Sequence, residues 1–359
     1  MARPGIMVGI AVGLLVSGSV SAAAQTSCGS LTQHRHDIDP SFGRDYYVYA
    51  PCDLPSVPVP LIVYLHGCNQ TAPEAATQTR FASLADQHKF IVVYPEQFDP
   101  RDDDLDGHLF DGNGAKCWNW FRPENWSRGS GEPAAIAAIT EAVMEANIDP
   151  DRVYLMGTSA GGVMAATMGA TYPDLYAAIS INAGCGYPAC ADPSGALAAA
   201  AMGESARMMP VIVFHGTADE AAAFPMGVDA VSQWLGTNDI VDDGTANGSV
   251  SRLPASVEHH GLDETAAGGL GTIGDVCVGN RTGSPCLGGA LGFPEEYPYS
   301  IAHYVDRERR PLLDFWIIHF LTHNYVSGDP GVAWSDPLGP DITQAAYDFF
   351  MAHPKDGGG

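Results

Sequence analysis

The stretch that decides the fold is residues 153–170, Val-Tyr-Leu-Met-Gly-Thr-Ser-Ala-Gly-Gly-Val-Met-Ala-Ala-Thr-Met-Gly-Ala. Its first four residues, Val153 to Met156, are apolar and predict a strand buried on both faces of a parallel sheet. The small residues after Ser159 predict a helix. Between them lies the pattern G-x-S-x-G, which at a strand-to-helix turn projects a serine hydroxyl from the sheet. We therefore predict that Ser159 is a nucleophile; the alternative is a structural tight turn.

Strands and helices alternate on both sides of this turn. Further strands are expected at residues 60–65, 90–95, 177–181 and 211–214, with an edge strand at 46–49 and a pair at 299–304 and 312–319. Helices are expected at 81–87, 134–147, 160–170 and 342–352, and a polar loop rich in Gly and Trp at 97–131. This alternation predicts the α/β class, with a mostly parallel sheet flanked by helices.

The first 24 residues predict a secretory signal peptide. A basic start at Arg3 precedes an apolar run at 6–16 and small residues at 19–24, and this run is too short to span a bilayer. Residues 25–359 are expected to form one domain, with a loop-rich insertion around 237–292. The protein is therefore predicted to be secreted, either outside the cell or into a periplasm.

Cysteine usage agrees with export. The chain has eight cysteines, and an even number in an exported protein predicts up to four disulfides. Spacing favours Cys185–Cys190 and Cys277–Cys286, which leaves Cys28–Cys52 and Cys68–Cys117; other pairings remain open. Cysteine and histidine lack the spacing of a zinc site, so no metal is predicted there.

Composition excludes two classes of partner. The chain has 17 Lys and Arg against 42 Asp and Glu, a formal charge of −25, with 46% apolar residues. A surface this acidic argues against binding nucleic acid, whose phosphates require cationic side chains, and against anionic membranes. The apolar fraction is ample for a core.

A serine hydroxyl becomes a good nucleophile only when a base removes its proton and an acid orients that base. In the order serine, acid, histidine, the acid is expected in the loop after the strand at 211–214. Asp219 is favoured there over its neighbour Glu220. For the base, His323 follows an apolar strand and is favoured over His319. The other histidines after the acid, at 259, 260, 303 and 353, are expected to be ordinary surface or core residues.

Ester attack also requires N–H donors that stabilise the oxyanion. One is expected to be the backbone amide of Ala160, next to the nucleophile. The other is expected from the loop after an early strand, at Cys68. A disulfide from Cys68 to Cys117 would hold that loop rigid, although Cys68 can also be interpreted as a disulfide residue alone.

Five motifs together resemble the poly(3-hydroxybutyrate) depolymerase family. They are Leu65-His66-Gly67-Cys68, Val93-Tyr94-Pro95-Glu96-Gln97, Cys117-Trp118-Asn119-Trp120-Phe121, Gly157-Thr158-Ser159-Ala160-Gly161 and His215-Gly216-Thr217-Ala218-Asp219. That family belongs to the α/β-hydrolases and is related to feruloyl and acetylxylan esterases, so a carbohydrate esterase that releases feruloyl or acetyl groups is the alternative function. The resemblance implies that residues 25–359 form a single α/β-hydrolase catalytic domain, and that Ser159, Asp219 and His323 hydrolyse a polyester or small ester without a cofactor.

The chain departs from the family around the base. The family usually has Gly-His-Ala-Trp, whereas this chain has Thr322-His323-Asn324-Tyr325. This difference is the basis of a further alternative, a secreted binding protein on an inactive hydrolase scaffold. Because the chain ends at Gly359, soon after the predicted catalytic domain, soluble or amorphous esters are expected rather than crystalline polymer.

Two loop features remain. Trp118, Trp120 and Trp126 are interpreted either as an ester-binding surface or as packing of their loop, and we predict substrate contact for Trp118 and Trp120. The acids of 102–106 resemble the first half of a calcium loop. Position 12 of that loop would be Asn113 rather than Glu, so a solvated acidic loop is favoured and no metal is predicted.

Overall fold

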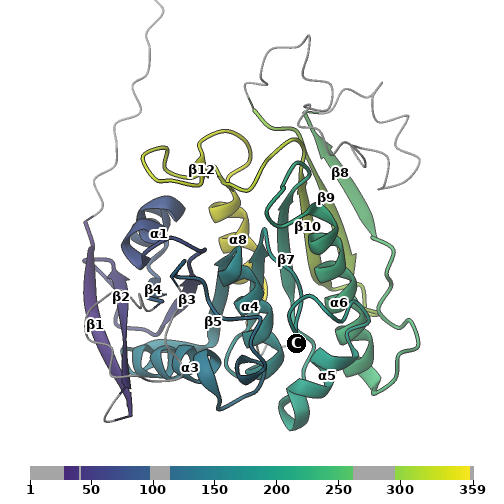
Figure 1. Ribbon diagram of the computed structural model, residues 1–359, viewed down its shortest axis with the longest axis horizontal. Coiled ribbons are helices and arrows are strands. Elements are labelled where there is room, and N and C mark those ends of the chain that lie inside the picture. The colour runs from purple at the N-terminus through teal and green to yellow at the C-terminus, as the bar shows by residue number, and fades with distance from the viewer. Residues whose placement is uncertain (1–27, 40–41, 98–113, 262–295, 356–359) are drawn as a thin grey trace, which may run out of the picture.

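A central sheet of ten strands forms the core of the computed structural model, which describes residues 28–39, 42–97, 114–261 and 296–355 (Figure 1). The strand order is β1-β2-β4-β3-β5-β6-β7-β10-β9-β8. In that order the strands are Ser30–Asp39, Phe42–Ala50, Ile91–Pro95, Val59–Leu65, Ile148–Thr158, Ala178–Asn182, Val211–Gly216, Pro311–Ile318, Tyr299–Val305 and Ser256–His260. The strands from β4 to β10 in this order are parallel to their neighbours, and antiparallel pairs close both ends.

The central strands form where the sequence has continuous apolar runs, because both of their faces are covered. In β3, Leu61 and Val63 belong to one hydrophobic cluster, and Ile62 and Tyr64 belong to the other. Successive side chains of a strand point to opposite faces, so each apolar residue of such a run is buried. This confirms the predicted α/β architecture and its mostly parallel sheet.

Helices form the two outer layers. The face of Leu61 is covered by α3 (Gly131–Met144), α4 (Ala160–Thr171), α5 (Ala196–Met202) and α6 (Phe224–Asp243). The other face is covered by α1 (Ala72–Thr79), α2 (Phe81–His88) and α8 (Ile342–Met351). Short 3₁₀ turns lie at Pro123–Asn125 and Gly203–Ser205, and a separate small sheet pairs β11 (Tyr325–Val326) with β12 (Ser335–Asp336).

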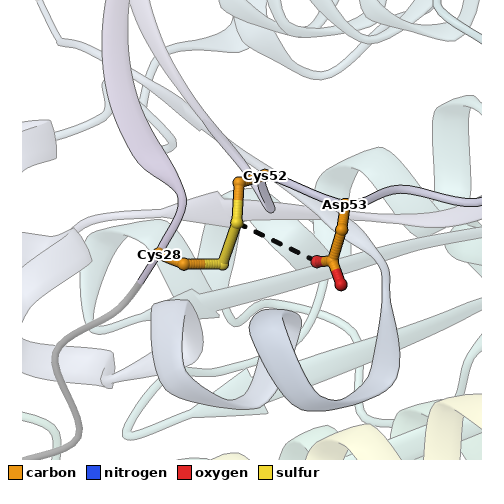
Figure 2. Close-up of side chains that lie close together, drawn as sticks. All are labelled: Cys28, Cys52 and Asp53. Carbon is orange, nitrogen blue, oxygen red and sulfur yellow. Dashed lines mark hydrogen bonds between the residues drawn. A yellow bond between two sulfur atoms is a disulfide. The ribbon is translucent and has the colours of Figure 1, made fainter.

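The strand predicted at 46–49 forms as part of β2, but its predicted place at the edge of the sheet is wrong, because β1 pairs with the outer side of β2. The side chains of 30–36 are nearly all exposed, so β1 lacks the apolar alternation that makes a strand visible in sequence. Backbone pairing holds it instead, and the Cys28–Cys52 disulfide ties its start to the end of β2, with 5.8 Å between the Cα atoms (Figure 2). The exposed strand β8 at the opposite edge was missed for the same reason.

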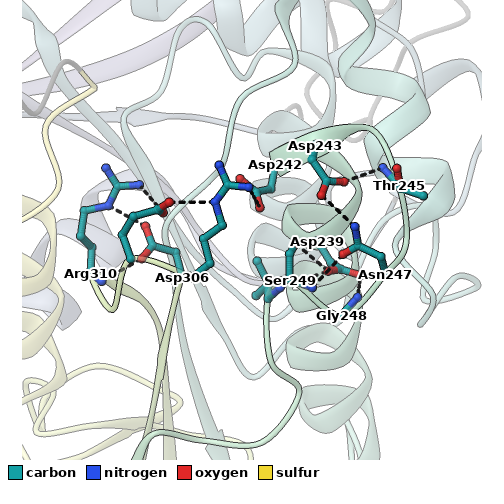
Figure 3. Close-up of polar contacts among 12 residues, drawn as sticks. Asp239, Asp242, Asp243, Thr245, Asn247, Gly248, Ser249, Asp306 and Arg310 are labelled. Carbon is teal, nitrogen blue, oxygen red and sulfur yellow. Dashed lines mark hydrogen bonds and ion pairs between the residues drawn. The ribbon is translucent and has the colours of Figure 1, made fainter.

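The loop-rich stretch expected at 237–292 begins with regular structure. Helix α6 continues to Asp243, and the loop after it folds back on the helix: Asp239 accepts hydrogen bonds from the amides of Gly248 and Val250, both at 3.0 Å (Figure 3). The helical pattern was obscured because this turn is rich in Asp, Asn and Gly. Strand β8 follows. Residues 262–295, and with them the predicted Cys277–Cys286 pair, lie outside the described residues, as do the predicted signal peptide and the acidic loop at 102–106.

Candidate active site

The turn between β5 and α4 holds Ser159 in a backbone conformation that few residues adopt. Its φ is 57° and its ψ is −121°. A Cβ atom at Gly157 would lie 2.1 Å from the carbonyl oxygen of Gly161, and one at Gly161 would lie 2.1 Å from that of Leu65. Both glycines are therefore required for the close approach of β3, β5 and α4, and the strained serine is the mark of a functional turn.

Hydrogen bonds fix this turn from both neighbouring strands. The Oγ1 of Thr158 lies 2.7 Å from the hydroxyl of Tyr64 on β3 and accepts from the amide of Asn182 on β6 at 3.0 Å. The backbone N–H of Ser159 donates to the carbonyl of Asn182 at 2.9 Å. The hydroxyl of Ser159 is thus presented at the carboxyl edge of the sheet by a rigid support.

Loops after β7 and β10 bring an acid and a histidine to the same place. The Nε2 of His323 is 3.0 Å from the Oγ of Ser159, and its Nδ1 is 2.7 Å from the Oδ2 of Asp219. The other carboxylate oxygen of Asp219 accepts from the amides of Ala221 and Ala222, at 2.9 and 2.8 Å. These contacts fix the carboxylate, and the carboxylate fixes the imidazole with Nε2 toward the serine.

The two alternative residues lie elsewhere. Glu220 is exposed, whereas the side chain of Asp219 is fully buried. His319 is buried and its Nε2 is 2.9 Å from the hydroxyl of Ser300 on β9. The structure therefore brings together Ser159, Asp219 and His323, the favoured set.

A second histidine, His215 at the end of β7, is buried next to Asp219. Its Nε2 donates to the carbonyl of Ala222 at 2.7 Å and is 3.9 Å from the Oδ2 of Asp219. Burial lowers the pKa of His215, which keeps it neutral near pH 7. The sequence placed His215 in a motif but did not predict this role, which is to support the loop that carries Asp219.

The loop after β3 lies against the serine. A Cβ at Gly67 would be 3.5 Å from the Cβ of Ser159, and Cys68 lines the same pocket as Ser159 and Ala160. Ala160 is the first residue of α4, where backbone N–H groups have no partner within the helix. The two amides predicted as oxyanion donors therefore lie on the two segments that flank the hydroxyl.

A buried histidine, His66, ties this loop to the neighbouring strand. Its Nδ1 donates to the carbonyl of Gly67 at 2.7 Å, and its Nε2 accepts from the amide of Gln97 at 3.0 Å. Burial lowers the pKa of His66 to about 4. His66 is therefore neutral, because a protonated ring would lose the acceptor that Gln97 requires.

A buried carboxylate on α3, Glu132, organises the next loop. It accepts from the side chain of Gln97 at 2.5 Å and from the backbone and side-chain nitrogens of Asn119 at 2.7 and 2.8 Å. The Cys68–Cys117 disulfide, with 4.2 Å between the Cα atoms, joins this loop to the one after β3. The acid, amides and disulfide together form one rigid wall of the site.

Substrate contact was predicted for Trp118 and Trp120, and the prediction for Trp118 is wrong. Trp118 is 0% exposed and its indole N–H donates to the carbonyl of His66 at 3.1 Å, so it packs the loop and cannot contact substrate. Trp120, two residues later, lines the pocket. Sequence reasoning treated the two rings alike because their types and spacing carry no information about which one faces the core.

The pocket beside Ser159 has a volume of about 190 Å³ and an uncharged lining. Both disulfides of this region, Cys68–Cys117 and Cys185–Cys190, contribute to its wall. The remaining lining is Trp120, Phe121, Ser159, Ala160, Val163, Ala183, Gly184, Ala221, Ala222 and Met226. A cavity of roughly 150 Å³ holds a benzene-sized ligand, so this one suits a short, uncharged acyl group.

One grouping with metal-ligand atoms occurs in the part of the chain that the structure describes. It consists of Cys28, Cys52 and Asp53 at the molecular surface (Figure 2). The two sulfurs form a disulfide, and the carboxylate of Asp53 pairs with Lys89 at 2.5 Å. These groups do not fit a metal.

The fold and the site together define an α/β-hydrolase, in which a serine at a strand-to-helix turn meets a histidine and an acid from later loops. Residues 44–254 match the family model described as "Esterase PHB depolymerase". The chain belongs to this family.

Among the helices of the described residues, none has the length and apolar composition of a membrane span.

Known esterases that are similar to this chain agree with the family assignment. The chain is 31% identical to poly(3-hydroxyalkanoate) depolymerase C of Paucimonas lemoignei over 68% of its own length, and spans 60% of that protein. It is 29% identical to feruloyl esterase B of Neurospora crassa, covering 60% of this chain and 78% of the relative. The solved acetyl xylan esterase from Aspergillus awamori superposes with a TM-score of 0.60 at 18% identity, over 90% of this chain and all of the other, which supports the fold.

Proposed function

We propose that the protein is a serine-dependent carboxylic ester hydrolase. The observation that carries the proposal is the hydrogen-bonded series Ser159–His323–Asp219, with 3.0 and 2.7 Å between the contacting atoms. Membership of the depolymerase family supports the same activity. The nucleophile, base and acid of this proposal are the three side chains that the loops bring to the carboxyl edge of the sheet.

In the proposed mechanism each of these groups has its own step. His323 removes the proton of Ser159 as its oxygen attacks the ester carbonyl, and the amides of Cys68 and Ala160 stabilise the resulting oxyanion. His323 then donates that proton to the departing alcohol, which leaves an acyl-serine. Water, deprotonated by the same imidazole, then attacks the acyl carbon. As the bond from that carbon to the Oγ of Ser159 breaks, His323 returns the proton to Oγ and the acid is released. Asp219 holds the ring and stabilises its positive charge during both steps.

The proposed substrate is a poly(3-hydroxybutyrate)-type polyester or its oligomers. The uncharged pocket beside Ser159 suits the neutral repeating unit of such a chain, and the name of the Paucimonas relative supports this class. The alternative is a feruloyl or acetylxylan ester, which the names of other relatives support. The match spans only 60% of the Paucimonas depolymerase, so the substrate class is proposed for this chain and is not carried over from that relative.

Product release from matched substrates separates these alternatives. We expect purified protein to release 3-hydroxybutyrate from short oligomers faster than ferulate from methyl ferulate or acetate from acetylated xylan, and Ser159→Ala to abolish all three. Faster release of ferulate or acetate would replace the polyester proposal by the alternative. No release of product by the wild type would remove the esterase proposal itself and leave a binding protein on a hydrolase scaffold. Equal, measurable rates for wild type and Ser159→Ala would show that Ser159 is not the nucleophile.

We further propose that the protein is secreted. The support is the signal-like composition of residues 1–24 and three disulfides among the described residues, which form in oxidising compartments. Expression with and without the first 24 residues tests this. The full chain is expected in the culture medium or periplasm, and retention of both forms in the cytoplasm would contradict it.

A further inference from the structure

A tryptophan outside the predicted site, Trp334, has both an exposed side chain and a strained backbone. Its side chain is 52% exposed, although burying an indole is among the most favourable of side-chain transfers. Its φ is 61°, a conformation that is an outlier for a bulky residue. Exposure and backbone strain both cost free energy, and such costs persist at positions that serve a function.

The strained backbone is held by two buried glutamines. The side chain of Gln78 donates to the carbonyls of Ala333 and Trp334 at 3.2 and 3.0 Å, and its oxygen accepts from Gln70 at 3.0 Å. Gln70 in turn accepts from the backbone N–H of Gly67 at 3.0 Å. This series runs from the loop that carries Cys68 to the segment that carries Trp334.

The same segment is also tied to the loop of the histidine. The amide of Tyr325, two residues after His323, donates to the carbonyl of Trp334 at 2.8 Å. The rings of His323 and Trp334 meet edge to face, with 6.4 Å between their centroids. The backbone of Trp334 is therefore held from two sides, and its indole lies beside the base.

The chemistry of the proposed reaction places the alcohol portion of the ester next to His323. His323 donates its proton to the alcohol oxygen, so the alcohol must depart next to the imidazole. The pocket beside Ser159 is lined by neither His323 nor Trp334. An acyl group bound in that pocket would leave the alcohol to extend past His323 toward the exposed indole.

We propose that Trp334 is a specificity residue that contacts the alcohol portion of the ester. An indole face binds an uncharged apolar group, such as an aryl ring or the next unit of a polyester chain, in preference to a bare methyl group. The inference rests on the proposed esterase activity. It adds that selectivity for the alcohol depends on a residue distinct from those that line the acyl pocket.

The test compares acetates of methanol and benzyl alcohol, which share one acyl group. In Trp334→Ala we expect the ratio of kcat/KM for benzyl acetate to that for methyl acetate to fall roughly tenfold, and in Trp334→Phe to stay near the wild-type value. Leu253→Ala is the matched control, because Leu253 is an apolar side chain 78% exposed on a loop outside the site. It should leave the ratio unchanged.

The outcomes separate the two proposals. An unchanged ratio of kcat/KM for benzyl acetate to methyl acetate in Trp334→Ala would overturn the inference. So would an equally large change in the ratio of kcat/KM for methyl hexanoate to methyl acetate, because these two esters differ in the acyl group alone. Wild-type protein that hydrolyses neither these esters nor the oligomers of 3-hydroxybutyrate would overturn the esterase proposal instead. Thermal melting checks that each variant is folded; if Trp334→Ala melts early, Trp334→Leu removes the ring while keeping apolar bulk and is judged by the same ratio.

Discussion

At the scale of single residues, the turn around Ser159 restricts three neighbouring positions through the backbone alone. Gly157 and Gly161 allow β3, β5 and α4 to approach closely, and Ser159 itself adopts a positive φ. This is why the five-residue motif, which is short, was informative in its strand-to-helix context. Its neighbours were less so: nothing in the sequence separated the buried Trp118 from the pocket residue Trp120.

The first prediction concerns Gly161. In Gly161→Ala the new Cβ would lie 2.1 and 2.6 Å from the carbonyl oxygens of Leu65 and His66, which are backbone atoms of the sheet and the loop after it. We expect a loss of about 3 kcal/mol in the free energy of unfolding, measured by denaturant titration. Gly114→Ala is the control, since a Cβ there meets nothing within 4 Å. Equal stability of the two variants would contradict the proposed backbone constraint.

The second prediction concerns the acid. Asp219→Asn preserves the volume of the side chain but places an amide where the Nδ1–H of His323 requires a carboxylate. We expect kcat to fall by about 10³–10⁴ with a small change in melting temperature. The adjacent, exposed Glu220 provides the control, and Glu220→Gln should keep wild-type kcat. A comparable loss in the two variants would argue that the acid has been misassigned.

At the scale of elements, polar contacts between segments distant in sequence build the walls of the site. His66 after β3, Gln97 after β4 and Glu132 on α3 form one buried set. None of these contacts was predicted, because each joins residues more than 30 positions apart and a side chain's partner is set by packing. The buried strands were predicted for the opposite reason: their apolar runs are a local signal, which the exposed β1 and β8 lack.

The third prediction is a pH dependence that originates at Glu96, directly after β4. Burial raises its pKa from 4.5 to about 7, so between these values the folded state binds a proton that the unfolded state has lost. The free energy of unfolding therefore falls as pH rises from 4.5 to 7. Glu96→Gln keeps an acceptor for the amide of Ala72, which Glu96 contacts at 2.6 Å, and removes this slope.

Denaturant titrations at pH 5 and pH 8 measure the effect. We expect the stability of Glu96→Gln relative to wild type to increase by about 2 kcal/mol between the two pH values. His66 contributes a slope of the opposite sign, because its lowered pKa reduces stability as pH falls below 6.5, but this contribution is present in both proteins. Parallel pH profiles would show that Glu96 titrates normally.

At the scale of the whole molecule, the disulfides divide into two kinds by position. Cys28–Cys52 fastens the outer strand β1 at one edge of the sheet, whereas Cys68–Cys117 lies in the wall of the pocket. Both pairs were left over once spacing had favoured Cys185–Cys190 and Cys277–Cys286. The sequence placed Cys68–Cys117 beside the predicted oxyanion donor, but it did not indicate that Cys28–Cys52 lies away from the site. That distinction depends on the strand order, in which β1 is separated from β5 by β2, β4 and β3.

The fourth prediction follows from this division. Replacing both cysteines of either pair by serine should lower the free energy of unfolding by about 2–4 kcal/mol. The Cys68/Cys117 double variant should also lose at least tenfold in kcat, since the amide of Cys68 would no longer be held in place. The Cys28/Cys52 variant should retain wild-type kcat at a temperature where both are folded. Equal kcat values for the two variants would remove the role assigned to the pocket disulfide.

The central claim of the proposed mechanism is that Ser159 forms a covalent bond with the substrate. Mass-spectrometric mapping after reaction with a fluorophosphonate measures this directly, because the reagent phosphonylates a serine that an adjacent base has activated. We predict one adduct per chain, on Ser159, that is absent in Ser159→Ala and formed far more slowly in His323→Gln. An adduct on a different residue, or no adduct in a folded chain that hydrolyses esters, would contradict the account.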